Sequence, residues 1–247
     1  MPECGDAMTT STAKLRRRTV KHEHTQQWRS TVRVLRSSNR FWRFTDFLGS
    51  SASAAQHLLT DLAARGALTR VRKGLYWRGV QTPLGMSPPH PDALVRELVG
   101  SSAVGPAGLS AANARRLSTQ VPRRAHVAVP ARAPESTGLV RFVSRPTRTA
   151  RAKARLTPMD VALLETLGDW ESVVEVPASK GWARLRGMLE ADGAMAERLA
   201  LASSTEPGGV RARLAGLLSA AGRHDLSDQV PGVDPRTRVA ALVFLSA

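Results

Sequence analysis

The chain has 247 residues, of which 42% are hydrophobic, and its 36 Lys and Arg exceed its 20 Asp and Glu to leave a formal net charge of +16. This length and apolar content are enough for one large domain or two modest ones. The single cysteine, Cys4, excludes an internal disulfide and a thiolate zinc cluster, and no apolar run reaches the roughly 18 residues of a membrane span. We therefore expect a cytoplasmic protein with a polyanionic partner.

The positive charge falls into two zones. Residues 1–80 hold 15 cations and 5 anions, and residues 96–155 hold 12 cations and 2 anions, so each zone has a net charge of +10. Only Asp92 is charged within residues 81–95, and residues 156–247, with 9 cations and 12 anions, have a net charge of −3. This asymmetry predicts at least two surfaces with different partners.

Composition divides the chain into four parts. Residues 1–24 are polar, basic and rich in Ser and Thr, which predicts a flexible arm. A domain over residues 25–80, a linker over residues 81–91 and a second domain over residues 92–247 follow. The arm could grip a groove of DNA or could serve only as a solubilising tail; its clustered cations are Arg16, Arg17, Arg18 and Lys21.

The domain over residues 25–80 begins with a helical pattern. One stripe of this helix has the spacing i, i+3, i+4, i+7 and consists of Trp28, Thr31, Val32 and Leu35. The segment FWRF (residues 41–44) predicts a short strand, and FTDFLG (residues 44–49) a brief helix. A longer helix follows, with Ser51 or Ser53 as its N-cap and Gly66 at its end.

The longer helix has two faces. We expect its apolar face to be core, formed by Ala55, Leu58, Leu59, Leu62 and Ala63. The runs ALTRV and LYWRGV around Gly74 predict a β-hairpin, in which one of Tyr76 and Trp77 belongs to the core and the other to the opposite face. Helix, strand, short helix, longer helix and hairpin is the order of a winged helix-turn-helix. The predicted fold class is α+β, with this unit followed by a mixed α/β C-terminal domain.

The polar face of the longer helix and the hairpin have the chemistry of a DNA reader. A helix fits the major groove, where Gln56 can pair with adenine and His57 can contact base or phosphate, and the amides at its start attract phosphate. The alternatives are a merely solvated helix face and charges that protect a sheet edge. The predicted DNA-binding residues are Ser51, Ser53, Gln56, His57, Thr60, Arg70, Arg72, Lys73 and Arg78.

The second domain is predicted to contain a helix at PDALVRELVG, strands at AHVAV and GLVRFVSRP, and a helix over LTPMDVALLETLGDW. Thr157 and Pro158 start that last helix, which presents Met159, Ala162, Leu163 and Leu167 on one face. Another helix is expected over residues 208–221, whereas the final run VAALVFLSA fits no element. The second basic zone has three alternative explanations. It could contact further DNA backbone, bind an acidic patch of a protein partner, or only reflect an Arg-rich composition. Its members are Arg115, Arg116, Arg123, Arg124, Arg141, Arg145, Arg148, Arg151, Lys153 and Arg155.

Three segments of the chain carry recognisable patterns. Leu62–Leu68 reads L-x-x-x-G-x-L, Arg70–Tyr76 reads R-x-x-x-G-x-Y in the predicted hairpin, and Leu117–Pro122 is similar to L-T-x-Q-V-P. Together they resemble AbiEi-type antitoxins, with a likeness over residues 25–220. The resemblance implies a winged helix that binds operator DNA and represses its own operon. Separately, a homodimer on the DNA is one arrangement that we consider. It also implies a C-terminal domain that counters a nucleotidyltransferase-type toxin, which this family does not always bind in a stable complex. The alternative is a winged-helix regulator with a ligand-sensing or oligomerising second domain, and a third is a DNA-cleaving enzyme.

We expect no enzyme, no cofactor and no metal site. His22 and His24 have no third ligand nearby, and the chain has no phosphate-binding loop and no G-x-S-x-G nucleophile motif. A metal-dependent nuclease would need converging carboxylates and a lysine, for which the candidates are Asp160, Glu165, Glu175 and Lys180. VPAS interrupts the strand that would present Glu175 and Lys180, and Glu165 is expected on the polar face of its helix.

Overall fold

The computed structural model describes residues 25–245. The chain is a mixed α+β protein that divides into two compact units, Met1–His90 and Pro91–Ala247. The arm predicted over residues 1–24, with Arg16, Arg17, Arg18 and Lys21, lies outside the described residues. None of the helices within residues 25–245 is long and apolar enough to cross a membrane.

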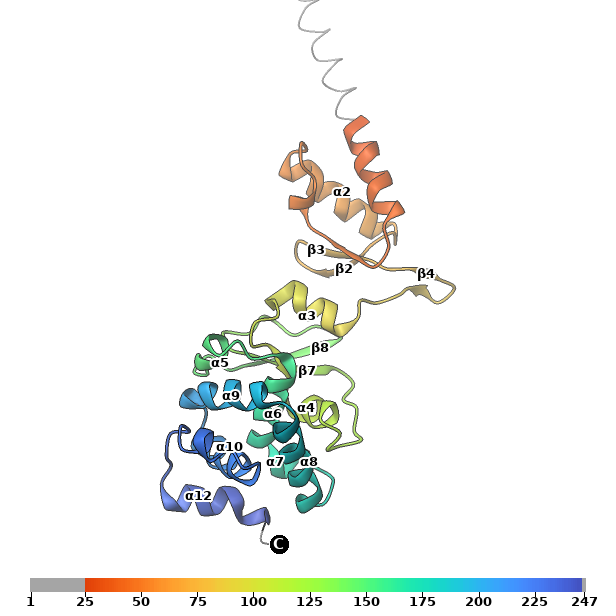
Figure 1. Cartoon of the computed structure of the whole chain (residues 1–247). Helices are drawn as coiled ribbons and strands as arrows, with labels where there is room; N and C mark the ends of the chain where they lie inside the picture. The colour runs from red at the N-terminus through yellow and green to blue at the C-terminus, as the bar shows by residue number, and fades with distance from the viewer. Residues whose placement is uncertain (1–24, 246–247) are drawn as a thin grey trace, which may run out of the picture. The chain divides into compact units, whose positions relative to one another are not determined.

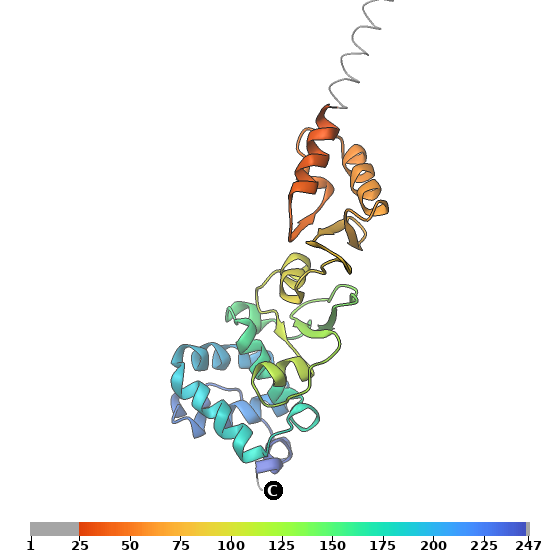
Figure 2. The same ribbon diagram turned by 90° about the vertical axis from the view of Figure 1, so that its right-hand side faces the viewer.

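The first unit has the element order that the sequence predicts. A helix over residues 25–36, called the first helix below, is followed by β1 (Arg40–Trp42), the 3-10 helix η1 (Phe44–Asp46), α2 (Ala52–Ala64), β2 (Thr69–Arg72) and β3 (Leu75–Arg78). The three strands form an antiparallel sheet in the order β1-β3-β2. The first helix and α2 lie side by side (Figures 1 and 2).

The core of this unit joins both helices to the sheet. Its buried side chains are Val34, Trp42, Phe47, Ala55, Leu58, Leu59, Leu62, Leu68 and Tyr76. The predicted helix is present, but its apolar stripe is not its most buried side, because Val34 on another side is fully buried while Trp28 is 67% exposed and Leu35 is 42% exposed. Val34 is thus the fully buried apolar side chain of this helix, which Arg33 also anchors by donating to the Asp46 carbonyl, whereas Trp28 and Leu35 of the stripe are exposed.

The predicted linker over residues 81–91 contains structure. β4 (Gln81–Thr82) and β5 (Gly85–Met86) form a second small hairpin. Ser87, which follows this hairpin, is bonded to the first sheet, since its carbonyl accepts the indole N–H of Trp77 at 2.7 Å. The Trp77 ring packs on Phe41 with centroids 4.7 Å apart. Tyr76 thus belongs to the core of the unit, as expected for one of the two, whereas Trp77 lies outside that core but is buried against Phe41 rather than resting against a helix or solvent.

The second unit packs helices around a three-stranded mixed sheet (Figure 1). The strands β6 (Gly105–Pro106), β7 (Ala125–Val129) and β8 (Val140–Ser144) follow the order β6-β7-β8, with β6 and β7 antiparallel and β7 and β8 parallel. The helices are α3 (Pro91–Val99), α4 (Gly108–Ala114), α5 (Ala150–Lys153), α6 (Pro158–Gly168), α7 (Trp170–Val173), α8 (Ala178–Ala191), α9 (Gly193–Ala202), η2 (Ser203–Thr205), α10 (Gly208–Ala220), α11 (His224–Ser227), α12 (Pro235–Leu242) and η3 (Val243–Leu245).

Helix α6 is the centre of this unit. Thr157 caps it by accepting the Asp160 amide at 3.2 Å, and the Asp160 carboxylate accepts the Thr157 amide in return at 2.9 Å. The predicted amphipathic face is wrong in detail, because every residue from 160 to 167 is buried whereas Met159 is 39% exposed. A helix buried all round needs partners on every side, and its two carboxylates must be paired there.

The final apolar run belongs to the same core. Phe244 in η3 stacks on Trp170 with ring centroids 4.6 Å apart and meets the edge of Trp182 at 5.7 Å. These aromatic contacts connect the C-terminal residues to α7 and α8, two helices that the sequence pattern does not predict.

Candidate nucleic-acid interface

The candidate site is the outer face of α2 together with the β2–β3 hairpin. Ser51 is the N-cap, since its hydroxyl accepts the Ala54 amide at 3.1 Å, and Ser53 lies inside the helix. The helix buries Ala55, Leu58, Leu59 and Leu62 against the core. The opposite face leaves Ser53, Gln56 and His57 exposed. These three side chains are therefore available to a ligand, as the sequence predicts.

Thr60 has a structural role on this face. Its hydroxyl donates to the Gln56 carbonyl at 2.8 Å and shares a hydrogen bond of 3.2 Å with the Tyr76 hydroxyl. Tyr76 lies in β3, so Thr60 fastens α2 to the hairpin. Its hydroxyl is therefore already bonded on both sides, although it was expected to meet DNA.

The hairpin presents cations at its turn. Gly74 has φ +77°, a left-handed conformation that glycine adopts without strain, and it turns the chain directly after Arg72 and Lys73. Arg70, Arg72 and Lys73 are exposed, and none of them forms an ion pair with another of the described residues. Three unpaired charges on one short hairpin form a cationic surface that is suited to phosphate.

Arg78 does not project from the hairpin, and that expectation is wrong. Its guanidinium donates to the Ala67 carbonyl at 3.1 Å and to the Leu35 carbonyl at 3.5 Å. The reason is topological, because β3 is the central strand and the end of it lies between the C-terminus of the first helix and the loop after α2. Arg78 therefore supports the unit rather than contacting a ligand.

Two further cations of the first unit are also used by its fold. Arg33 lies over Trp42, 5.1 Å from the ring centroid, and donates to the Asp46 carbonyl. Arg40 also lies over Trp42, 4.4 Å from the ring centroid. Counting cations in the sequence therefore overestimates the number that a partner can reach.

A concavity borders the start of α2. It has a volume of about 400 Å³ and is lined by Gln26, Gln27 and Ser30 from the first helix and by Ser50, Ser51 and His57 from the loop and α2. The sequence pattern did not single out the first three of these residues. The sequence does contain a signal for them, because they are polar and lie away from the apolar stripe of the first helix. Side chains in such positions meet either the next helix or solvent.

The second basic zone is partly internal. Arg151 is fully buried and bonds both Glu165 and Glu206, and Arg145 and Arg148 bond Glu165 at 2.9 and 2.5 Å. Burial, followed by the charge of Arg151, lowers the pKa of the Arg148 guanidinium against the opposing charges of the two carboxylates. Arg115 and Arg151 are buried and Arg148 is nearly so, so these three cannot serve as a binding surface, whereas the Arg145 side chain stays 25% exposed.

The rest of the zone is on the surface. Its exposed members are Arg116, Arg123, Arg124, Arg141, Lys153 and Arg155. His126 lies opposite Arg141 in the β7–β8 register, and burial together with the charges of Arg141 and Arg124 lowers the pKa of its imidazole. These six exposed cations are the part of the second basic zone that an anionic partner could reach.

The carboxylates weighed as nuclease ligands each have separate partners. Asp160 pairs with Arg198 at 2.7 Å, and Glu165 is buried among arginines rather than on a polar helix face, which corrects that expectation. Glu175 accepts Ser118 and Thr119, and Lys180 lies in α8. Within residues 25–245 no group of three His, Cys, Asp or Glu could hold a metal ion, while His22 and His24 lie outside that range.

Comparisons with known proteins do not assign the chain. No family model matches it, and no curated protein matches it. Among solved structures, the RV2827C protein from Mycobacterium tuberculosis matches at 18% sequence identity and a TM-score of 0.47, over 89% of this chain and 81% of that one. The functional proposal therefore depends on the geometry of the first unit and on its sequence motifs.

Proposed function

We propose that the first unit is a winged helix-turn-helix that binds double-stranded DNA, with α2 as the recognition helix and the β2–β3 hairpin as the wing. The observation that carries the proposal is the 3.2 Å contact between Thr60 and Tyr76. It joins the exposed polar face of α2 to the hairpin whose turn holds Arg72 and Lys73. The side chains proposed to read bases and those proposed to bind phosphate thus belong to one folded unit, which is what major-groove reading needs.

The chemistry assigns different roles to the two parts. Gln56 can pair with adenine in a bidentate manner, and His57 can contact a base edge or a phosphate. The amides of the first turn of α2, a helix of 13 residues, attract phosphate. Arg70, Arg72 and Lys73 then bind the backbone beside the groove without reading sequence.

The role of an antitoxin is proposed on the sequence motifs. Leu62–Leu68, Arg70–Tyr76 and Leu117–Pro122 resemble AbiEi-type antitoxins, so the operator would lie in the protein's own promoter and the second unit would counter a nucleotidyltransferase-type toxin. Such a role would be carried out in the cytoplasm. The alternative is a regulator whose second unit senses a ligand or oligomerises.

The DNA proposal is tested by fluorescence anisotropy with duplexes that tile the region upstream of the protein's own gene. One duplex should bind at least about 10³-fold more tightly than a scrambled duplex of the same composition at physiological salt. Equal affinity for every duplex would contradict base-specific recognition and would mean that the protein binds DNA only through non-specific electrostatic contacts.

The antitoxin proposal needs a separate test. The neighbouring gene is expressed with and without this protein, and growth is followed. Arg72→Ala/Lys73→Ala should lose repression in a promoter reporter but still restore growth, because the second unit is unchanged. A neighbouring gene that does not inhibit growth would favour the alternative regulator.

A further inference from the structure

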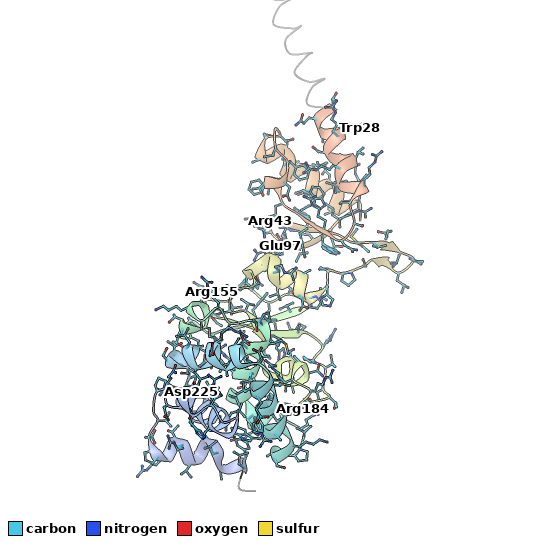
Figure 3. The ribbon with its side chains drawn as sticks, viewed as in Figure 1. Trp28, Arg43, Glu97, Arg155, Arg184 and Asp225 are labelled. Atoms are coloured by element: carbon cyan, nitrogen blue, oxygen red, sulfur yellow. The ribbon has the colours of Figure 1, made fainter. Side chains whose placement is uncertain are left out.

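The first helix has an apolar stripe that the described residues cover only in part, since Val32 is half-buried while the residues on either side of it along the stripe are exposed. Trp28, Val32 and Leu35 follow one another at i, i+4 and i+7 and therefore lie on one side of the helix. Trp28 is 67% exposed and Leu35 is 42% exposed, whereas Val34, which points to the core, is fully buried. Figure 3 shows Trp28 on this helix. An exposed indole with two aliphatic neighbours has the character of an interaction surface.

The surface has a ridge with a groove on each side. Trp28 separates a groove of about 240 Å³, floored by Leu58 and Leu62, from a wider groove of about 510 Å³ that contains Val32 and Arg36. A ridge beside a groove on the same helix can fit an identical copy turned by a two-fold axis, since each ridge then enters the partner's groove.

Side-chain complementarity favours a second copy as the occupant. The larger groove contains Arg29, Arg33 and Arg36 beside the exposed Trp28, and the smaller one contains Asp61 and Arg65. A copy that brings Trp28 onto Arg36 provides a cation–π contact on each side of the two-fold axis. Nucleic acid suits this surface less well, because its phosphates could pair with the arginines but would leave the indole and the two aliphatic side chains without an apolar partner.

We propose that two copies of the chain associate through antiparallel, two-fold packing of their first helices, with Val32 at the axis. Residues equidistant from position 32 then meet, so Trp28 of each copy lies against Arg36 of the other. Asp61 lies on the flank of α2 beside the first helix, whereas Ser53 and Gln56 lie on the exposed face, so the DNA-reading face stays free. The proposal does not depend on DNA binding.

Salt should strengthen this association. Residues 25–80 contain ten Lys and Arg and two Asp, a net charge of +8, so two copies repel each other at low ionic strength. Added salt screens that repulsion and leaves the apolar contact. A nucleic-acid or acidic protein partner would give the opposite dependence.

The test is sedimentation of the full chain without DNA, from about 1 to 100 µM and at two salt concentrations. The mass should rise from 26.6 kDa toward twice that value, and more readily at the higher salt. Trp28→Ala should weaken association by at least about tenfold. Val239→Ala, which removes another exposed side chain (70%) in α12, should leave it unchanged.

A cross-linking experiment locates the axis. In a Cys4→Ser background, Val32→Cys should form an interchain disulfide because a residue on a two-fold axis meets itself within the roughly 7 Å that a disulfide spans. Leu48→Cys, at another exposed position of the same unit (88%), should not. Three outcomes would overturn the proposal. They are a chain that stays monomeric, an association that Trp28→Ala does not weaken, and a cross-link that forms through Leu48→Cys but not through Val32→Cys.

Discussion

Arg151 and Glu206 form a two-pronged ion pair inside the second unit. The Arg151 Nε donates to Glu206 Oε1 at 2.6 Å and its Nη2 donates to Oε2 at 2.9 Å, and neither side chain is exposed. Glu206→Ala should leave a buried guanidinium short of a partner and lower the free energy of unfolding by about 3–5 kcal/mol. Urea denaturation followed by circular dichroism measures this loss.

The chain offers a matched control for that variant. Glu190 pairs with Arg186 one helical turn away at 3.2 Å, but both side chains are about half exposed. Glu190→Ala should therefore change the free energy of unfolding by only about 0.3–0.5 kcal/mol. If the two variants lose the same stability, the buried cluster is not a structural centre.

The same cluster predicts how stability depends on pH. Burial alone would raise the pKa of Glu165, but a hydrogen bond from Arg145 and the charges of Arg151, Arg148 and Arg145 together hold it below the ordinary value of 4.5. A lowered pKa in the folded state contributes stability that is complete above the ordinary value and lost as the pH falls toward the lowered one.

Thermal unfolding should therefore show a stable plateau down to about pH 5 and a steep loss of melting temperature below it. Glu165→Gln should be less stable than the unchanged chain on the plateau and should lose less on acidification, because its side chain does not titrate. A variant whose melting temperature falls in parallel with that of the unchanged chain would contradict the assignment.

Local features of the fold could be predicted from the sequence, whereas the positions of several charged side chains could not. Local rules act over a few residues, so the Ser51 cap, the Gly66 stop and the Gly74 turn are all found where the pattern predicts them. Glu165 and Arg78 were misplaced because their partners are distant in sequence: Glu165 meets arginines 14 to 20 positions away, and Arg78 meets Leu35. Periodicity cannot reveal such pairs, because it records only which residues share a face.

The first helix shows a second limit. Its apolar stripe through Trp28 is real, but a stripe does not say whether the fold or another molecule covers it. The three-dimensional arrangement is needed to show that Val34 makes the contact with the core.

Glu175 is expected to hold the loop that carries the motif LSTQVP. Its carboxylate accepts the Ser118 hydroxyl and the Thr119 amide, both at 2.8 Å, and also the Gln120 side chain. The Thr119 amide, followed by the Ser118 hydroxyl, lowers the pKa of this carboxylate. Glu175→Ala should therefore increase hydrogen exchange at Thr119 without changing the global unfolding midpoint. Slow exchange at Thr119 in the variant would show that the backbone alone orders the loop.

The hairpin cations should control the salt dependence of DNA binding. Arg72→Ala/Lys73→Ala removes two exposed charges, so the slope of log K against log salt should fall by about 2, equally for specific and scrambled duplexes. Arg78→Ala is the contrasting variant. It should leave the slope unchanged but destabilise the first unit by about 1–3 kcal/mol, since two carbonyls lose their donor. A change of slope with Arg78→Ala would mean that this side chain leaves its internal bonds to meet DNA.

The exposed face of α2 should carry sequence preference. Gln56→Ala removes a side chain that can bond adenine at two atoms, so it should weaken binding to the preferred duplex by about 1–3 kcal/mol and bind scrambled DNA as before. Ser53→Ala on the same face is the control, because a lone hydroxyl contributes less than a bidentate amide. Substituting each base pair of the site in turn should then show one position at which the variant no longer discriminates. An equal loss on every duplex would mean that Gln56 only positions the helix, and that the preference comes from the shape of the DNA.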